Sequence, residues 1–141
     1  MYYAKHDKFI IEDNQVHTTD FLPLKKKYKN MEFLGIFKEI VTMFEIDTYM
    51  ELGVRKGYTF NNIAPLVKSA VAVDIGDMKN IIELPNVTKI QMRTDDLALK
   101  WNEPIDFLFI ETIIAITMPF IINFFYVRKF ISITCSYTMI Q

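Results

Sequence analysis

The sequence predicts an α/β fold: a Rossmann-like parallel sheet with flanking helices. Short apolar runs alternate with helical patterns between residues 46 and 111. The run at 49–52 leads into a turn bracketed by Gly53 and Gly57, and the run at 70–73 ends in the carboxylate of Asp74. Strands that alternate with helices imply a parallel sheet with right-handed crossovers.

The elements follow from these patterns in chain order. Residues 1–29 are polar and aromatic and include three consecutive lysines, which predicts an N-terminal arm or lid. Asn30 is placed to cap a helix from Met31 to Glu45, whose apolar residues form one core-facing stripe. The remaining expected elements are strands at 47–52, 70–74, 87–92 and 105–110, helices at 58–68 and 78–83, and a short turn before the last strand.

The turn from Gly53 through Val54 to Gly57 is the candidate ligand-binding loop. Glycine at position 53 permits a positive φ and lets a ligand approach the main chain. Gly57 stands where a helix would begin and expose free N–H groups. A tight strand-to-helix turn also uses two glycines for purely structural reasons, so the loop alone does not decide between the two roles.

Asp74 strengthens the binding hypothesis through its spacing. It follows Gly53 by 74 − 53 = 21 positions, close to the roughly 20 residues at which nucleotide-binding βαβ units place an acid on the ribose hydroxyls. A carboxylate accepts two hydrogen bonds from a cis-diol. The structural alternative is that Asp74 caps the next helix, with Gly76 in the turn.

With these motifs in this order, residues 46–111 resemble the class I S-adenosylmethionine-dependent methyltransferases, in particular those with small-molecule or sugar-type acceptors. The matching residues are Glu51, Gly53 and Gly57, then Val73 and Asp74, then Thr94, Asp95 and Asp96, and finally Ile105 to Glu111. Arg55 replaces the second glycine of the dinucleotide-binding pattern, which favours a mononucleoside-like ligand over NAD.

The resemblance implies roles for individual residues. Glu51 would hold the amino group of the methionine part, and Asp74 the ribose. Asp95 or its neighbour would bind the adenine amine, with Thr94 and Ile75 as flanking walls; the alternative for the acidic pair is a helix N-cap. The implied cofactor-binding residues are Glu51, Gly53, Val54, Gly57, Asp74, Ile75, Thr94, Asp95 and Asp96. Methyl transfer needs little beyond in-line positioning, so no catalytic base is identified.

Length and composition agree with a single cytoplasmic domain, and the resemblance implies a small-molecule substrate. The chain has 141 residues, 51% of them hydrophobic, and a net charge of −1, which gives no bias toward nucleic acid. Cys135 is the only cysteine, so neither an intramolecular disulfide nor a cysteine-rich metal site is expected. His6 and His17 have no metal-ligand spacing. Nothing indicates the oligomeric state.

We therefore divide the chain into an arm (1–29), a partial S-adenosylmethionine-binding domain (30–111) and an apolar tail (112–141). The sheet is expected to stop after the fourth strand, because the tail matches nothing in the resembled family. The acceptor-binding half would then be missing, leaving a truncated enzyme or a non-catalytic nucleoside-binding remnant.

Three interpretations of the tail compete. Residues Ile113 to Val127 are apolar enough for a membrane anchor, but they fall short of the roughly 20 residues that a span needs and contain Pro119 and Asn123. A membrane-associated protein is the corresponding alternative function. The second interpretation is a buried strand or helix that closes the sheet. The third, which we favour from the sequence, is translation out of frame. When codons for the residues from Glu111 onward are chosen freely and read two bases later, the encoded peptide resembles the His-Ser-Tyr turn expected after the fourth strand in the resembled family.

Overall fold

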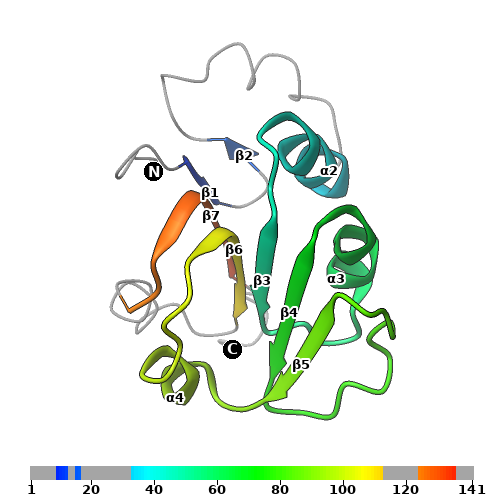
Figure 1. Cartoon of the computed structure of the whole chain (residues 1–141), viewed down its shortest axis with the longest axis vertical. Helices are drawn as coiled ribbons and strands as arrows, with labels where there is room; N and C mark the ends of the chain where they lie inside the picture. Colours follow the sequence, from blue (N-terminus) through cyan, green and yellow to red (C-terminus); the bar gives the residue numbers. More distant parts are fainter. Residues whose placement is uncertain (1–8, 13–14, 17–32, 113–123, 136–141) are drawn as a thin grey trace.

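A computed structural model of the chain describes residues 9–12, 15–16, 33–112 and 124–135. It contains a seven-stranded sheet in the order β2-β1-β7-β6-β3-β4-β5 (Figure 1). The strands are β1 (Phe9–Glu12), β2 (Gln15–Val16), β3 (Thr48–Leu52), β4 (Ser69–Asp74), β5 (Val87–Gln91), β6 (Ile105–Thr112) and β7 (Val127–Cys135). All neighbouring strands are parallel except β1 and β2. The predicted Rossmann-like α/β class is confirmed.

Helices cover both faces of this sheet. They are α2 (Phe33–Met43), α3 (Tyr58–Ile63), the 3₁₀ turn η2 (Ala64–Leu66) and α4 (Thr94–Ala98). Alternate strand residues enter two separate apolar clusters, because successive side chains of a strand point to opposite faces. Tyr49 joins the cluster formed with α2 and α3, whereas Met50 joins the cluster formed with α4. The sheet is therefore the middle layer of a three-layer sandwich (Figure 1).

The apolar stripe predicted for the first long helix is confirmed as core. Phe37 of α2 is fully buried, and its ring packs 4.8 Å from that of Phe107 and 4.9 Å from that of Phe109 on β6. The helix ends at Met43, before the expected Glu45, because Glu45 adopts a left-handed backbone conformation with φ 50°.

The four expected strands are present, but the helices between them are shorter than predicted. The expected helix at 58–68 ends at Ile63, and Pro65, which lacks a backbone donor, lies in the 3₁₀ turn that follows. The helix expected at 78–83 is wrong. The side chain of Asn61 holds this segment in turns: it donates to the Asn80 carbonyl at 2.9 Å and accepts from the Ile82 N–H at 2.9 Å.

The sheet does not stop after the fourth strand, so the expected truncation is wrong at this point. β7 pairs in parallel with the free side of β6, and β1 pairs with the far side of β7. Phe130 and Ile131 of β7 are buried in the two opposite clusters. An unpaired edge of β6 would have been unfavourable, and β7 covers it. Strands from both ends of the chain thus complete the sheet.

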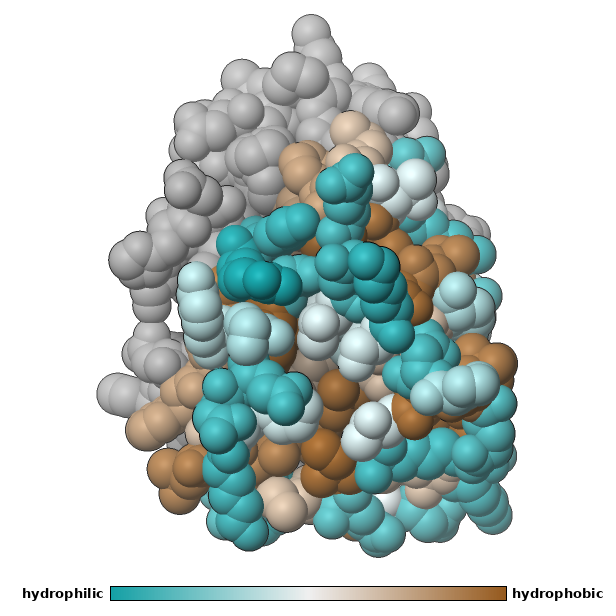
Figure 2. All heavy atoms as spheres, in the orientation of Figure 1, coloured by the Kyte–Doolittle hydropathy of each residue, from teal (hydrophilic) through white to brown (hydrophobic). Residues whose placement is uncertain are grey.

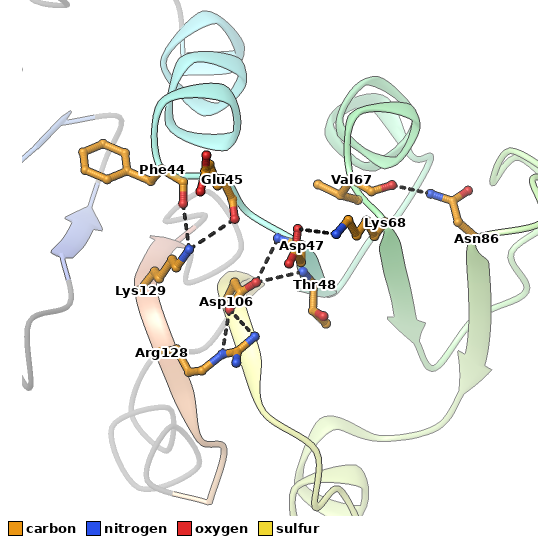
Figure 3. Close-up of polar contacts among 10 residues, drawn as sticks. All are labelled: Phe44, Glu45, Asp47, Thr48, Val67, Lys68, Asn86, Asp106, Arg128 and Lys129. Carbon is orange, nitrogen blue, oxygen red and sulfur yellow. Dashed lines mark hydrogen bonds and ion pairs between the residues drawn. The ribbon is translucent and has the colours of Figure 1, made fainter.

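Asp106 joins three strands at the amino edge of the sheet (Figure 3). Its side chain is 1% exposed. Oδ2 accepts the backbone N–H groups of Asp47 at 2.8 Å and Thr48 at 3.1 Å. Oδ1 lies 2.7 Å from both Nε and a terminal nitrogen of Arg128. The pairing of β6 with β7 shifts by one residue at this point, as in a β-bulge.

Lys129, the next residue of β7, binds the end of α2. Its ammonium donates to the carbonyls of Phe44 at 2.8 Å and Glu45 at 3.2 Å (Figure 3). A cation is favourable there because the last carbonyls of a helix lack partners within it. Arg128 and Lys129 are the only charged residues after position 111, and both make specific bonds.

The second interpretation of the tail, a strand that closes the sheet, therefore holds for residues 127–135. Both of its cations make specific bonds, but a fold of the translated chain does not test the reading frame, so the out-of-frame origin stays a prediction. Most of the segment considered as a membrane anchor, residues 113–123, lies outside the described residues. Within the described ranges, no helix has the length and apolar character needed to cross a membrane.

Replacing Asp106 with alanine should lower the free energy of unfolding by about 2–4 kcal/mol, because two backbone N–H groups and a guanidinium would lose their acceptor. Urea denaturation followed by circular dichroism measures the change. Lys68→Ala is the control, because its ion pair with Asp47 is exposed and should contribute at most about 1 kcal/mol. Equal losses in the two variants would show that Asp106 does not hold the strands together.

Candidate functional site

The candidate site lies where three parallel strands end at the carboxyl edge of the sheet. β3 lies between β4 and β6. Leu52 pairs with Val73 on one side and Ile110 on the other, so the next residues, Gly53, Asp74 and Glu111, lie at the same level near the carboxyl ends of the strands. The chain leaves β3 toward β4, while β6 lies on the opposite side. This is the topological switch point at which open α/β sheets bind ligands.

The loop after β3 has the conformation that its glycines predict. Gly53 and Gly57 both have φ of 86°. A Cβ at position 53 would collide with the backbone carbonyl oxygen of Glu111. The N–H groups of Gly53 and Val54 bond the Val73 carbonyl at 2.8 and 3.3 Å, which fixes the loop to the end of β4. The glycine at position 53 is thus required both for its dihedral angle and for the close approach of β6.

Asp74 organises this loop through both carboxylate oxygens. Oδ2 accepts the N–H of Arg55 at 2.8 Å, and Oδ1 accepts the N–H of Gly76 at 2.9 Å. The turn with Gly76 that the sequence offered as an alternative is therefore present, but no helix follows it. A carboxylate oxygen accepts more than one hydrogen bond, so Asp74 can hold the loop and bind a diol at once. The ribose role stays a prediction.

Glu51 is the buried acid beneath the loop. It is 0% exposed, and its Oε1 accepts the hydroxyl of Tyr49 at 2.6 Å. Its Oε2 has no hydrogen-bond partner among the described residues. Burial raises the pKa of Glu51 well above its usual range; the Tyr49 hydrogen bond opposes this, and the charges of Glu111 and Asp74 add to it. An unpaired carboxylate oxygen in the interior is costly, which favours a cation or a donor close by.

Glu111 and Arg55 form a loose ion pair at the rim, with Nε and Oε1 3.7 Å apart. The Arg55 side chain is 42% exposed and that of Glu111 29%. Burial raises the pKa of Glu111, and the charge of Arg55 partly opposes that rise. The sequence did not assign a role to Glu111, although its position as an acid at the end of an apolar run could have indicated one. Arg55 entered the sequence analysis only because its side chain leaves little room for a pyrophosphate.

The residues expected around adenine follow β5, one strand farther from the switch point. Arg93, and not an aspartate, is the N-cap of α4, so the N-cap alternative for Asp95 and Asp96 is wrong. Asp95 makes two 3.0 Å hydrogen bonds to Arg93, and these lower its pKa. Thr94 begins the same helix.

Ile75 lies nearer to the loop. It follows Asp74 directly, is 70% exposed, and its carbonyl accepts from the Gln91 side chain at 3.2 Å. The structure thus brings Glu51, Gly53, Val54, Gly57, Asp74 and Ile75 together at the ends of β3 and β4. Thr94, Asp95 and Asp96 follow the next strand.

Two further observations bear on the site. Figure 2 shows the hydrophobic residues among the coloured, described part of this face in small groups between hydrophilic ones. Within the part of the chain that the structure describes, no three His, Cys, Asp or Glu residues are arranged to hold a metal ion.

A scan against protein-family models and a search of curated proteins both give no match to this chain.

Gly53→Ala should destabilise the protein by at least the roughly 1–2 kcal/mol that a left-handed conformation costs a residue with a Cβ, and the clash with the Glu111 carbonyl adds to it. Gly76→Ala is the matched control, because a Cβ there would meet only the Asp74 carboxylate at an ordinary 3.6 Å. Thermal unfolding of both variants measures the difference. A Gly53→Ala protein as stable as the control would contradict the observed loop geometry.

The raised pKa of Glu51 predicts a pH-dependent stability. The folded state holds the proton of Glu51 more tightly than the unfolded state does. The protonated Glu51 therefore contributes its full stabilisation below about pH 4.3, the usual glutamate pKa, and this stabilisation is lost as pH rises through the higher pKa of the folded state. Glu51→Gln should lack this loss, so its stability relative to the wild type should increase with pH. Urea unfolding between pH 5 and 9 would show a constant difference if Glu51 were ionised throughout.

Proposed function

We propose that this chain is an S-adenosylmethionine-dependent methyltransferase domain of the cytoplasm that acts on a small molecule. One observation carries the proposal: a glycine loop with positive φ crosses the switch point of a Rossmann-like sheet, between the acids that end β3, β4 and β6. The order and spacing of these residues are those by which the sequence resembles class I methyltransferases.

The charges of the site favour this cofactor over a dinucleotide. Glu51, Asp74 and Glu111 are three acidic groups, and among the described residues the Arg55 side chain pairs with Glu111 alone. A pyrophosphate at the loop would lie next to these carboxylates, and like charges a few ångströms apart repel strongly in a partly buried site. S-adenosylmethionine instead brings an ammonium and a sulfonium group, both of which the carboxylates of Asp74 and Glu111 would attract.

The arrangement also suits the nucleoside part. Asp74 has spare acceptor capacity for the ribose hydroxyls, and the exposed Ile75 beside it offers an apolar surface for the base. Thr94, Asp95 and Asp96 would complete the adenine side from the end of β5. Asp95 keeps acceptor capacity beyond its bonds to Arg93.

S-adenosylhomocysteine should bind the purified 141-residue chain, and Asp74→Asn should weaken binding roughly tenfold or more, because a charge-assisted hydrogen bond contributes about 1.5–3 kcal/mol. Isothermal titration calorimetry measures both affinities, with Asp77→Asn as the control. Asp77 is exposed, and its Oδ1 accepts only from the nearby Lys79 N–H among the described residues.

Unchanged affinity in Asp74→Asn would refute the ribose role. Tighter binding of NAD than of S-adenosylhomocysteine would refute the cofactor class.

A further inference from the structure

We propose that Asn61 of α3 is a positioning residue for the nucleoside side of the site, an inference that rests on the proposed function. Asn61 itself would not touch the ligand. Its side chain ties the segment that follows Asp74 to the helix that follows the glycine loop. It thereby fixes the loop and this segment relative to each other.

Asn61 holds the connection between β4 and β5 through both polar atoms of its amide. Nδ2 donates to the Asn80 carbonyl at 2.9 Å, and Oδ1 accepts the Ile82 N–H at 2.9 Å. Figure 1 shows this connection passing beside α3. Residues 75–86 form neither helix nor strand, so side-chain bonds of this kind determine the path of the segment.

The glycine loop is joined to Asn61 through the backbone. The Asn61 N–H bonds the Gly57 carbonyl at 2.8 Å, and the Gly57 N–H bonds the Val54 carbonyl at 2.9 Å. A Cβ on Gly57 would lie 2.7 Å from Cδ1 of Ile81 and 3.0 Å from Nδ2 of Asn61. Glycine at position 57 therefore lets the segment pack directly on the loop.

The loop and the segment also meet at Asp74. Its two carboxylate oxygens accept the N–H groups of Arg55 in the loop and Gly76 in the segment. Asp74 thus holds the start of the segment, and Asn61 holds its far end. Ile75, the proposed surface for the base, lies on a segment that is fixed at two points.

Loss of the Asn61 bonds should loosen the segment without unfolding the protein. Met78 and Ile81 stay buried in the apolar cluster formed with α2 and α3. The Lys89 ammonium still pairs with Glu83. The segment would then adopt its binding conformation for only part of the time, and the apparent affinity falls by that fraction.

Calorimetric titration of the full chain with S-adenosylhomocysteine and with 5′-methylthioadenosine tests this role. Asn61→Ala should weaken both ligands about tenfold, as for a binding conformation populated about one-tenth of the time. The two factors should be equal, because both ligands carry the same nucleoside. Asn61→Asp keeps the volume but lacks the donor for the Asn80 carbonyl, so it should also weaken both ligands.

Asn86→Ala is the matched control. The Asn86 amide also makes two bonds, to the carbonyls of Ala64 at 2.9 Å and Val67 at 2.8 Å, but at the amino edge where β4 and β5 begin (Figure 3). Thermal unfolding should show similar destabilisation in the two alanine variants, because each loses two hydrogen bonds. Only the Asn61 variants should lose affinity for the ligands.

Nuclear magnetic resonance of the labelled chain without ligand gives a second readout. Asn61→Ala should move the amide signals of Ile75 and Gly76, at the other end of the segment, and Asn86→Ala should leave them in place. Unchanged signals there would show that Asn61 does not fix the segment.

Unchanged affinity in both Asn61 variants, or equal losses of affinity in Asn61→Ala and Asn86→Ala, would overturn the positioning role and leave the proposed function standing. A wild-type chain that binds neither ligand would overturn both.

Discussion

The buried carboxylate of Asp106 is the constraint on which the rest of the structure depends. It accepts the N–H groups of Asp47 and Thr48 where β3 begins, and it pairs with Arg128 where β7 begins. Because one buried group binds all three strands, their register is fixed at the amino edge. The positions of Gly53 and Glu111 at the opposite edge follow from that register.

The two edges of the sheet differ in how their acids are satisfied. At the amino edge, both oxygens of Asp106 have hydrogen-bond or ion-pair partners within the protein. At the carboxyl edge, Glu51 has a buried oxygen without a partner among the described residues, and Glu111 has only a loose ion pair. Buried polar groups are normally paired, so the unpaired oxygen of Glu51 supports the proposal of a ligand at the carboxyl edge.

Local patterns in the sequence were enough for the centre of the fold. Apolar runs with alternating helical segments marked β3 to β6, and the spacing of Gly53 and Asp74 located the loop. β7 could not be predicted in this way, because its stability comes from Asp106 and from phenylalanines distant in sequence. The turns at 78–83 depend likewise on Asn61, twenty or so residues earlier.

The candidate site was predictable only in part for the same reason. Positive φ at Gly53 is a local property, and it was predicted correctly. The meeting of Arg55 with Glu111 joins residues from two non-consecutive strands, so it depends on the strand order. The N-cap alternative for Asp95 and Asp96 was wrong because α4 begins at Thr94 with Arg93 as its N-cap, and spacing alone did not reveal that boundary.

The most direct test of ligand binding at the switch point is a nuclear magnetic resonance titration of the labelled chain with S-adenosylhomocysteine. Backbone amide shifts should change at the loop from Gly53 to Gly57, at Asp74 and Ile75, and at Glu111, while Asp47, Thr48 and Arg128 at the opposite edge stay unchanged. Shift changes centred on the amino edge, or none at saturating ligand, would contradict the proposed site.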